Sequence, residues 1–386
     1  MRILFVASRL HPNYTDSLSA LAKKHPLNVL VTRQAENERH EGLSLSHSPD
    51  GPISRLLEPL HRWAGLSSEQ IAYRKRHPSL LFLVRFIHKH RIDTVYARRD
   101  NKHLLRTARI AAWLTGCRYV SYRQQIFDAA KPMDRHAVYP LRMAPSMDEA
   151  PANFIPLTID LSRFPKCAPL PPYAPGGDEP LRIMAVGKLI ERKGHHLLIR
   201  AIAQLGERLP LQVNIYGGYS SFHARQFGQQ IADLIVQHGL QDRVTLMPMI
   251  TPDAMPAEYG KHHLFVYSGW ESRPEREPDV VTYQRATGAC GTRLYSLIEA
   301  MAAGLPVVCA SDYHVIGALE NGGNGLVFEK GDATDLGAKI EAISQMDLAA
   351  MGARSRALIE AHHDAQDFPA RFELLLADER KRGLMR

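Results

Sequence analysis

The chain has 386 residues, 45% of them hydrophobic, and a formal net charge of +8. This length suits two domains of roughly 150–200 residues, and the apolar content excludes a disordered chain. The four cysteines are scattered without a CxxC pair, which indicates reduced thiols and no zinc site. Met1 and Arg2 run directly into a short apolar segment, so we expect no signal peptide and a cytoplasmic protein.

The positive charge is concentrated in one region of the first half. Between Ala72 and Ile110 there are eleven Lys or Arg against two Asp, together with four His. Such a balance suits a phosphate-rich partner, which could be nucleic acid, an anionic membrane face or a phosphorylated substrate. The sequence has no zinc-finger pattern, RNA-recognition motif or long basic tail, so we expect no nucleic-acid partner.

The first half alternates apolar strand patterns with helical patterns. Strands are expected at 2–7, 27–32, 94–96 and 118–122, and helices at 16–24, 79–90 and 104–114, while 33–70 carries no assignable pattern. Apolar strands without alternation, separated by helices, are typical of a parallel sheet covered on both faces.

The second half restarts the same rhythm after a proline-rich stretch at 165–180. Strands are expected at 181–186, 211–216, 244–247, 264–267, 307–310 and 325–328, and helices at 195–205, 224–238, 294–303, 335–343 and 348–362. The prediction is therefore an α/β protein with two doubly wound, Rossmann-like domains facing across a cleft. The boundaries are 1–164 for the N-terminal acceptor domain, 165–180 for the linker and 181–362 for the nucleotide-sugar domain. Residues 363–386 form a C-terminal helix that could cross back to the first domain.

Residues 185–196, AVGKLIERKGHH, predict an anion site. A strand ends at Val186, Gly187 permits a tight turn, and a helix begins after Gly194. Lys188 and Lys193 lie in the turn, beside the exposed N–H groups of the helix. A solvated basic loop is the alternative.

Residues 292–308 predict a helix that carries a carboxylate among small and apolar residues. Leu294, Leu297 and Met301 share its buried face, whereas Glu299 needs a partner if it is buried. A ribose diol could supply two hydroxyl donors; an exposed helix face is the alternative. Gly288 and Gly291, just before the helix, would let a phosphate approach the backbone amides.

These segments jointly resemble the C-terminal domain of GT-B retaining glycosyltransferases of the family 4 type. The matching motifs are Gly187-Lys188-Leu189, Lys193-Gly194, the run EAMAAGLPVV at 299–308, NGLVF at 324–328, Gly331-Asp332, and the crossover from Ile155 to Asp160 with Phe164. The resemblance covers residues 153–340 by motif, and the N-terminal half only by its alternation of strand and helix patterns.

The resemblance implies transfer of a sugar from a nucleoside diphosphate sugar to an acceptor hydroxyl, with retention of configuration and without a metal or other cofactor. The implied catalytic residues are Glu271, Lys188 and Lys193. The implied donor-binding residues are Gly187, Lys188, Lys193, Glu271, Glu299, Leu294 and Tyr295. Other implied partners are a carbohydrate or lipid-linked acceptor, in cell-surface polysaccharide, lipopolysaccharide or glycolipid assembly.

Two departures from the family pattern affect these assignments. The first family Glu should lie at position 291, which is Gly, whereas SGWE at 268–271 matches the motif around it. An insertion of about twenty residues, 272–291, accounts for the displacement and keeps Glu271 as the donor-sugar residue. The N-terminal domain lacks the family's Gly-rich loop and later His, so His11, Arg98 and Arg123 are acceptor-side candidates only by their positions at strand ends.

Two further questions stay open at this point. A GT-B phosphorylase or epimerase, or a degenerate protein that binds nucleotide sugar or a partner without catalysis, would share most of these motifs. The basic helix near Tyr73–Arg91 either lies on the anionic inner face of the plasma membrane or is a core helix with a solvated basic face.

Overall fold

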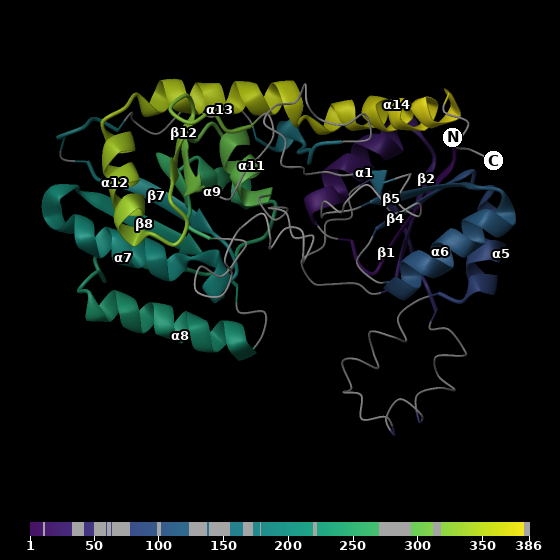
Figure 1. Ribbon diagram of the computed structural model, residues 1–386, viewed down its shortest axis with the longest axis horizontal. Helices are drawn as coiled ribbons and strands as arrows, with labels where there is room; N and C mark the ends of the chain where they lie inside the picture. Colours follow the sequence, from purple (N-terminus) through teal and green to yellow (C-terminus); the bar gives the residue numbers. More distant parts are fainter. Residues whose placement is uncertain are drawn as a thin grey trace. The chain divides into compact units, whose positions relative to one another are not determined.

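The computed structural model describes residues 1–10, 12–32, 42–49, 59, 63, 78–98, 102–122, 137–138, 155–164, 173–177, 179–218, 222–269, 295–311 and 318–381 (Figure 1). These residues form two compact units. The first contains the described residues up to 138 together with 155–158 and 365–381, and the second contains 159–364.

The first unit is built on a sheet whose neighbouring strands are all parallel. Its strands are β1 (Ile3–Ala7), β2 (Leu27–Val31), β3 (Ser44–His47), β4 (Thr94–Arg98), β5 (Arg118–Tyr122) and β6 (Ala137–Val138). Their order is β3-β2-β1-β4-β5-β6. Every residue of β1 is buried, as expected for a central strand covered on both faces.

Helices cover both faces of this sheet. The helices are α1 (Pro12–Lys24), α5 (Leu80–His90), α6 (Lys102–Thr115) and α14 (Phe368–Lys381). Alternate residues of β1 point to opposite sides: Phe5 packs with α1 and α14, and Leu4 packs with α5 and α6. The C-terminal helix α14 thus completes the core of the first unit, where Phe372 contacts Tyr96.

The second unit repeats the same design. Its strands are β7 (Leu181–Val186), β8 (Leu211–Tyr216), β9 (Val244–Met247), β10 (Leu264–Tyr267), β11 (Val307–Ala310) and β12 (Gly325–Phe328), in the order β12-β11-β10-β7-β8-β9. Its helices are α7 (His195–Leu205), α8 (Phe222–Gln237), α9 (Met255–Tyr259), α11 (Tyr295–Ala302), α12 (Ala333–Ser344) and α13 (Leu348–His362). All neighbouring strands are again parallel.

Both sheets reverse their strand order at one point, between β1 and β4 and between β7 and β10. Ligands of doubly wound sheets bind outside the carboxyl ends of the strands at such a reversal. The predicted α/β class with two parallel sheets is confirmed. A ligand site in the second unit is therefore expected at the ends of β7 and β10.

Two of the strands and one of the α-helices given above were not expected from the sequence. Strand β3 is a polar edge strand with no buried residue, so it lacks a hydrophobic signal. Strand β6 has two residues and helix α9 has five, which is too short for a period to be visible. None of the helices in the described ranges is long and apolar enough to cross a bilayer.

Candidate active site

The turn after β7 is pressed against the end of β10. It contains a short 3-10 helix, Glu191–Lys193, which ends at Gly194 with φ of 69°. A Cβ at Gly194 would lie 1.9 Å from the carbonyl oxygen of Ser268, directly after β10. Glycine is therefore required both for the left-handed backbone and for the close approach. The turn and the end of β10 are locked together at the reversal of strand order.

This packing fixes the position of one lysine. The ammonium of Lys193 donates a 2.6 Å hydrogen bond to the hydroxyl oxygen of Tyr267, the last residue of β10. The same nitrogen lies 4.8 Å from the centre of the Tyr267 ring. Its methylene chain runs past Gly187, where an added Cβ would lie 3.2 Å from it. The structure thus holds a cation where β7 and β10 end.

A buried histidine supports the same turn. His195, the first residue of α7, is 2% exposed, and its Nε2 donates to the Gly187 carbonyl oxygen at 3.1 Å. Because a carbonyl only accepts, Nε2 carries the proton of the neutral ring. Burial lowers the pKa of His195 to about 4, so the ring is neutral near pH 7. It therefore orients the turn without adding charge.

The other predicted members of the turn are placed as follows. Gly187 directly follows β7, and the next residue, Lys188, is exposed. The amides at the start of α7 follow Gly194, its N-cap residue. Two lysines and a helix N-terminus therefore belong to one short segment, which suits an anionic group.

Glu299 is the centre of a second, buried polar cluster. The carboxylate lies on α11 and is 7% exposed. Its Oε2 accepts a 3.2 Å hydrogen bond from the Tyr259 hydroxyl, and its Oε1 lies 3.9 Å from Nη2 of Arg163. Burial, and then the nearby Glu299 charge, raise the pKa of Tyr259, which keeps it a hydrogen-bond donor. The Glu299 carboxylate thus has two protein partners, Tyr259 and Arg163, that were not predicted from the sequence.

Arg163 ties this cluster to neighbouring backbone. It comes from the segment before the proline-rich stretch, and its Nη2 donates to the Pro252 carbonyl oxygen at 2.9 Å. Its Nη1 approaches the hydroxyl of Tyr295 at 3.5 Å. Tyr295, a predicted donor-binding residue, begins α11 and is 8% exposed. The cluster brings Tyr295 and Glu299 together around one arginine.

In the first unit, Arg98 has a structural environment. It ends β4, is 9% exposed and lies 4.5 Å from the centre of the Tyr14 ring. Its Nη1 donates to the Tyr14 hydroxyl at 2.8 Å, and that hydroxyl donates to the Arg9 carbonyl oxygen. This chain of bonds fixes the turn after β1 at the strand-order reversal. Arg98 is therefore held by Tyr14 at the end of β4 rather than projecting into solvent, and its acceptor-side role stays a prediction.

Residues 180–346 match the family model described as glycosyl transferases group 1. This match spans β7 to α12 and includes the turn with Lys193 and the residues Tyr259, Tyr295 and Glu299, whereas Arg163 lies before it. The second unit carries a glycosyl transferases group 1 domain.

A curated protein is similar to about half of the chain. The chain is 30% identical over 212 residues to WcaL of Escherichia coli (strain K12), described as a colanic acid biosynthesis glycosyltransferase. That alignment covers 53% of this chain and 45% of WcaL, so the chain spans less than half of its relative's length.

Solved structures match over nearly the whole chain. HepE of Anabaena in complex with UDP-glucose has a TM-score of 0.68 at 17% identity, over 98% of this chain and 100% of HepE. The lipopolysaccharide outer core galactosyltransferase WaaB has a TM-score of 0.63 at 13% identity, over 98% of this chain and 100% of WaaB. The predicted GT-B fold is confirmed.

Several predicted residues lie outside the described residues. They are Glu271, Leu294, His11 and Arg123, together with the insertion 272–291 and the two glycines in it. Their roles stay predictions. Among the described residues of both units, no group of three or more His, Cys, Asp or Glu could hold a metal ion.

Four residues of the second unit were missed from the sequence. Tyr267 ended a correctly predicted strand, but nothing in the sequence pairs it with Lys193 across 74 residues. His195 was placed in a helix without a role, and Arg163 and Tyr259 carried no motif. Tyr267 and His195 lie at the ends of predicted elements, whereas the short helices that end at Arg163 and Tyr259 were not predicted. The partners of all four residues depend on tertiary packing.

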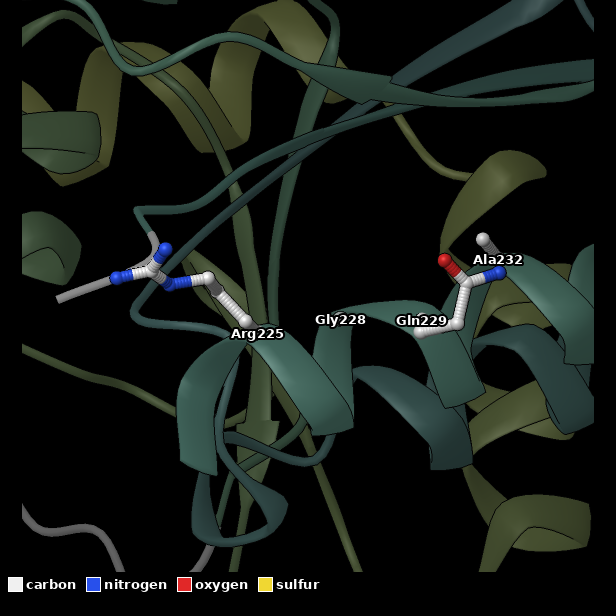
Figure 2. A pocket seen from close by; sticks show the side chains of 4 residues that line it. All are labelled: Arg225, Gly228, Gln229 and Ala232. Carbon is white, nitrogen blue, oxygen red and sulfur yellow. The ribbon is translucent and has the colours of Figure 1, made fainter. Parts of the chain in front are cut away.

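A separate hollow of about 490 Å³ lies along α8 (Figure 2). It is lined by Arg225, Gly228, Gln229 and Ala232, all on that helix. The side chains of Arg225 and Gln229 extend away from each other in Figure 2. None of the four is a predicted site residue, so we assign the hollow no role.

Proposed function

We propose that the chain transfers a sugar from a nucleoside diphosphate sugar to an acceptor hydroxyl. The observation that carries this proposal is the Lys193 ammonium, held 2.6 Å from Tyr267 at the strand-order reversal of a glycosyl transferases group 1 domain. HepE, which shares the fold, was solved with UDP-glucose, so a UDP-sugar is the first donor to test. The acceptor would be a carbohydrate or lipid-linked glycan in cell-surface polysaccharide or lipopolysaccharide assembly, in keeping with WcaL and WaaB.

Charge builds on the diphosphate as the sugar departs, and preorganised cations stabilise that charge. Lys193 and Lys188 would contact the phosphates, with Gly187 leaving room for them. Glu299 would hold the ribose, beside Tyr295 and Leu294 at the start of α11. Glu271 would contact the sugar hydroxyls. No resident cofactor is needed for this chemistry.

The transferred group would be a hexose or related sugar, and its anomeric configuration would be retained. The reaction would take place on the cytoplasmic side of the membrane. A degenerate protein that binds nucleotide sugar without turnover is not favoured, because the turn with Lys188 and Lys193 is built and packed in full.

The test is a panel of nucleotide sugars incubated with candidate acceptors, read by release of nucleoside diphosphate and by the mass of the product. One donor should give a product heavier by one glycosyl unit, and nuclear magnetic resonance of its anomeric proton tests retention. Tight binding of a nucleotide sugar without product across the panel would favour the degenerate protein. Release of a sugar phosphate, or interconversion of the donor, would favour a phosphorylase or an epimerase.

A further inference from the structure

The outer surface of α5 and α6 in the first unit carries exposed apolar and basic side chains. The two helices lie side by side on one face of the sheet (Figure 1). Their inner residues, among them Leu83, Phe86 and Leu104, form a core with β1 and β4. The outer residues of both helices therefore face solvent on the same side of the unit; we call this surface the α5–α6 face.

Large apolar side chains are exposed on this face. Trp113 is 78% exposed and its neighbour Leu114 is 54% exposed, both in the last turn of α6. Leu81, in the first turn of α5, is 58% exposed. A single exposed apolar residue is ordinary, but here an indole and two leucines occur on two adjoining helices. Trp is enriched where a protein meets the interfacial layer of a bilayer.

The charge on the face has one sign. Neither α5 nor α6 contains an acidic residue. The exposed stripe of α5 carries Arg85, His88 and Lys89, and that of α6 carries Arg106. The nearby carboxylate of Asp93 is engaged elsewhere, because it accepts from the Arg2 backbone N–H at 2.7 Å and contacts Arg118 at 3.3 Å. The face is therefore cationic with apolar side chains between its charges.

We propose that the α5–α6 face docks on an anionic lipid surface. Lys and Arg would lie at the phosphate level, and Trp113 with Leu114 would enter the interfacial layer, as in helices that lie in the membrane plane. Nucleic acid is the other polyanion that fits the charge, but exposed leucines contribute nothing on a phosphate backbone. Docking is independent of the transfer reaction, so a failure of one does not imply a failure of the other.

Vesicle co-sedimentation tests the proposal. Wild-type protein should bind phosphatidylglycerol vesicles at low salt and leave phosphatidylcholine vesicles unbound. Arg85→Gln with Lys89→Gln should weaken binding about 30-fold, since each cation contributes roughly fivefold. Trp113→Ser with Leu114→Ser should weaken it at least tenfold at unchanged charge. The matched control is Val236→Ser with Leu374→Ser, two aliphatic side chains that are 60% and 69% exposed outside the face; this variant should bind as wild type.

A fluorescence measurement avoids disturbing the face. In a Trp63→Phe, Trp270→Phe background, Trp113 is the remaining tryptophan, because the chain has three. Its emission should shift to the blue and be quenched by brominated lipid when anionic vesicles are added. An unshifted emission, equal binding of the serine variant and wild type, or stronger binding to DNA than to vesicles would each overturn the proposal.

Discussion

The ammonium of Lys193 and the hydroxyl of Tyr267 are 2.6 Å apart, although 74 residues separate them in the chain. Lys193 ends the turn after β7 and Tyr267 ends β10, the two strands between which the sheet reverses its order. The hydrogen bond fixes the Lys193 ammonium beside the end of β10. It is the structural reason for assigning the diphosphate of a donor to this turn.

Removing the hydroxyl should loosen that lysine. Tyr267→Phe keeps the ring under the ammonium and deletes the acceptor, so donor affinity should fall about fivefold, the equivalent of roughly 1 kcal/mol. The control is Tyr216→Phe at the end of β8, on the other side of β7, where the tyrosine hydroxyl donates to Glu258 at 2.8 Å. Titration calorimetry with nucleoside diphosphate compares the two. Equal affinities for Tyr267→Phe and wild type would mean that Tyr267 does not position the cation.

Gly194 should be intolerant of a side chain. Gly194→Ala adds left-handed strain of roughly 1–2 kcal/mol and a clash with the Ser268 carbonyl, so we expect several kcal/mol of lost stability. Gly239→Ala is the control for strain alone, because Gly239 also has a positive φ but open space around its Cβ position. Urea unfolding measures both. Similar losses for the two variants would show that the turn can move away from β10.

The neutral state of His195 should make folding sensitive to acid. Its pKa is about 4 in the folded protein against 6.5 normally, so below pH 6.5 the unfolded chain binds the extra proton. Stability should therefore fall as the pH drops from 6.5 towards 4, by about 2 kcal/mol at pH 5 from this group.

The variant His195→Gln isolates this contribution. Gln can keep a donor to the Gly187 carbonyl but cannot titrate, so the slope of unfolding free energy against pH should be smaller than in wild type. His196, with a pKa also lowered to about 4, leaves part of the slope in place. Identical slopes would contradict the assignment of a buried neutral ring at His195.

The two predicted glutamates, Glu299 and Glu271, should affect different quantities: nucleotide affinity and turnover. Glu299→Gln should weaken nucleoside diphosphate binding about tenfold, because the ribose is present in donor and product alike. Glu271→Ala should chiefly lower turnover, since a bare diphosphate has no sugar for it to touch. Tyr259→Phe separates binding from packing: it removes one internal partner of Glu299 and the bond from the hydroxyl to the Ser296 carbonyl oxygen, and it should cost about 1 kcal/mol of stability while affinity is retained. Unchanged nucleotide affinity in Glu299→Gln would make that residue purely structural.

The sequence predicted most elements because their patterns are local. The strand at 181–186 and the helix at 195–205 have the observed bounds, since an apolar run and a helical period are visible in neighbouring residues. The turn with Lys193 was found by its glycines and charges. Its partner Tyr267 was not, because pairing across two strand ends depends on the order of the sheet.

The same limit applies to Glu299. The sequence left open whether Glu299 is buried or exposed, and Tyr259 and Arg163 reach it from segments far away in the chain. Local pattern establishes which residues need partners, whereas only tertiary packing decides which partners they obtain. The polar strand β3 was not predicted, because an edge strand without buried residues has no apolar pattern.

The central claim is that the turn after β7 binds the diphosphate of a nucleotide sugar. Titration calorimetry of the wild type, Lys193→Ala and the control Lys339→Ala with uridine diphosphate tests it most directly. Lys339 lies on α12 and pairs with Asp335, so it is a cation of the same unit with no assigned role. Lys193→Ala should bind roughly 10- to 150-fold more weakly, from 1.5–3 kcal/mol for a charged hydrogen bond, while Lys339→Ala binds as wild type. A folded Lys193→Ala that binds the nucleotide as tightly as wild type would contradict the claim.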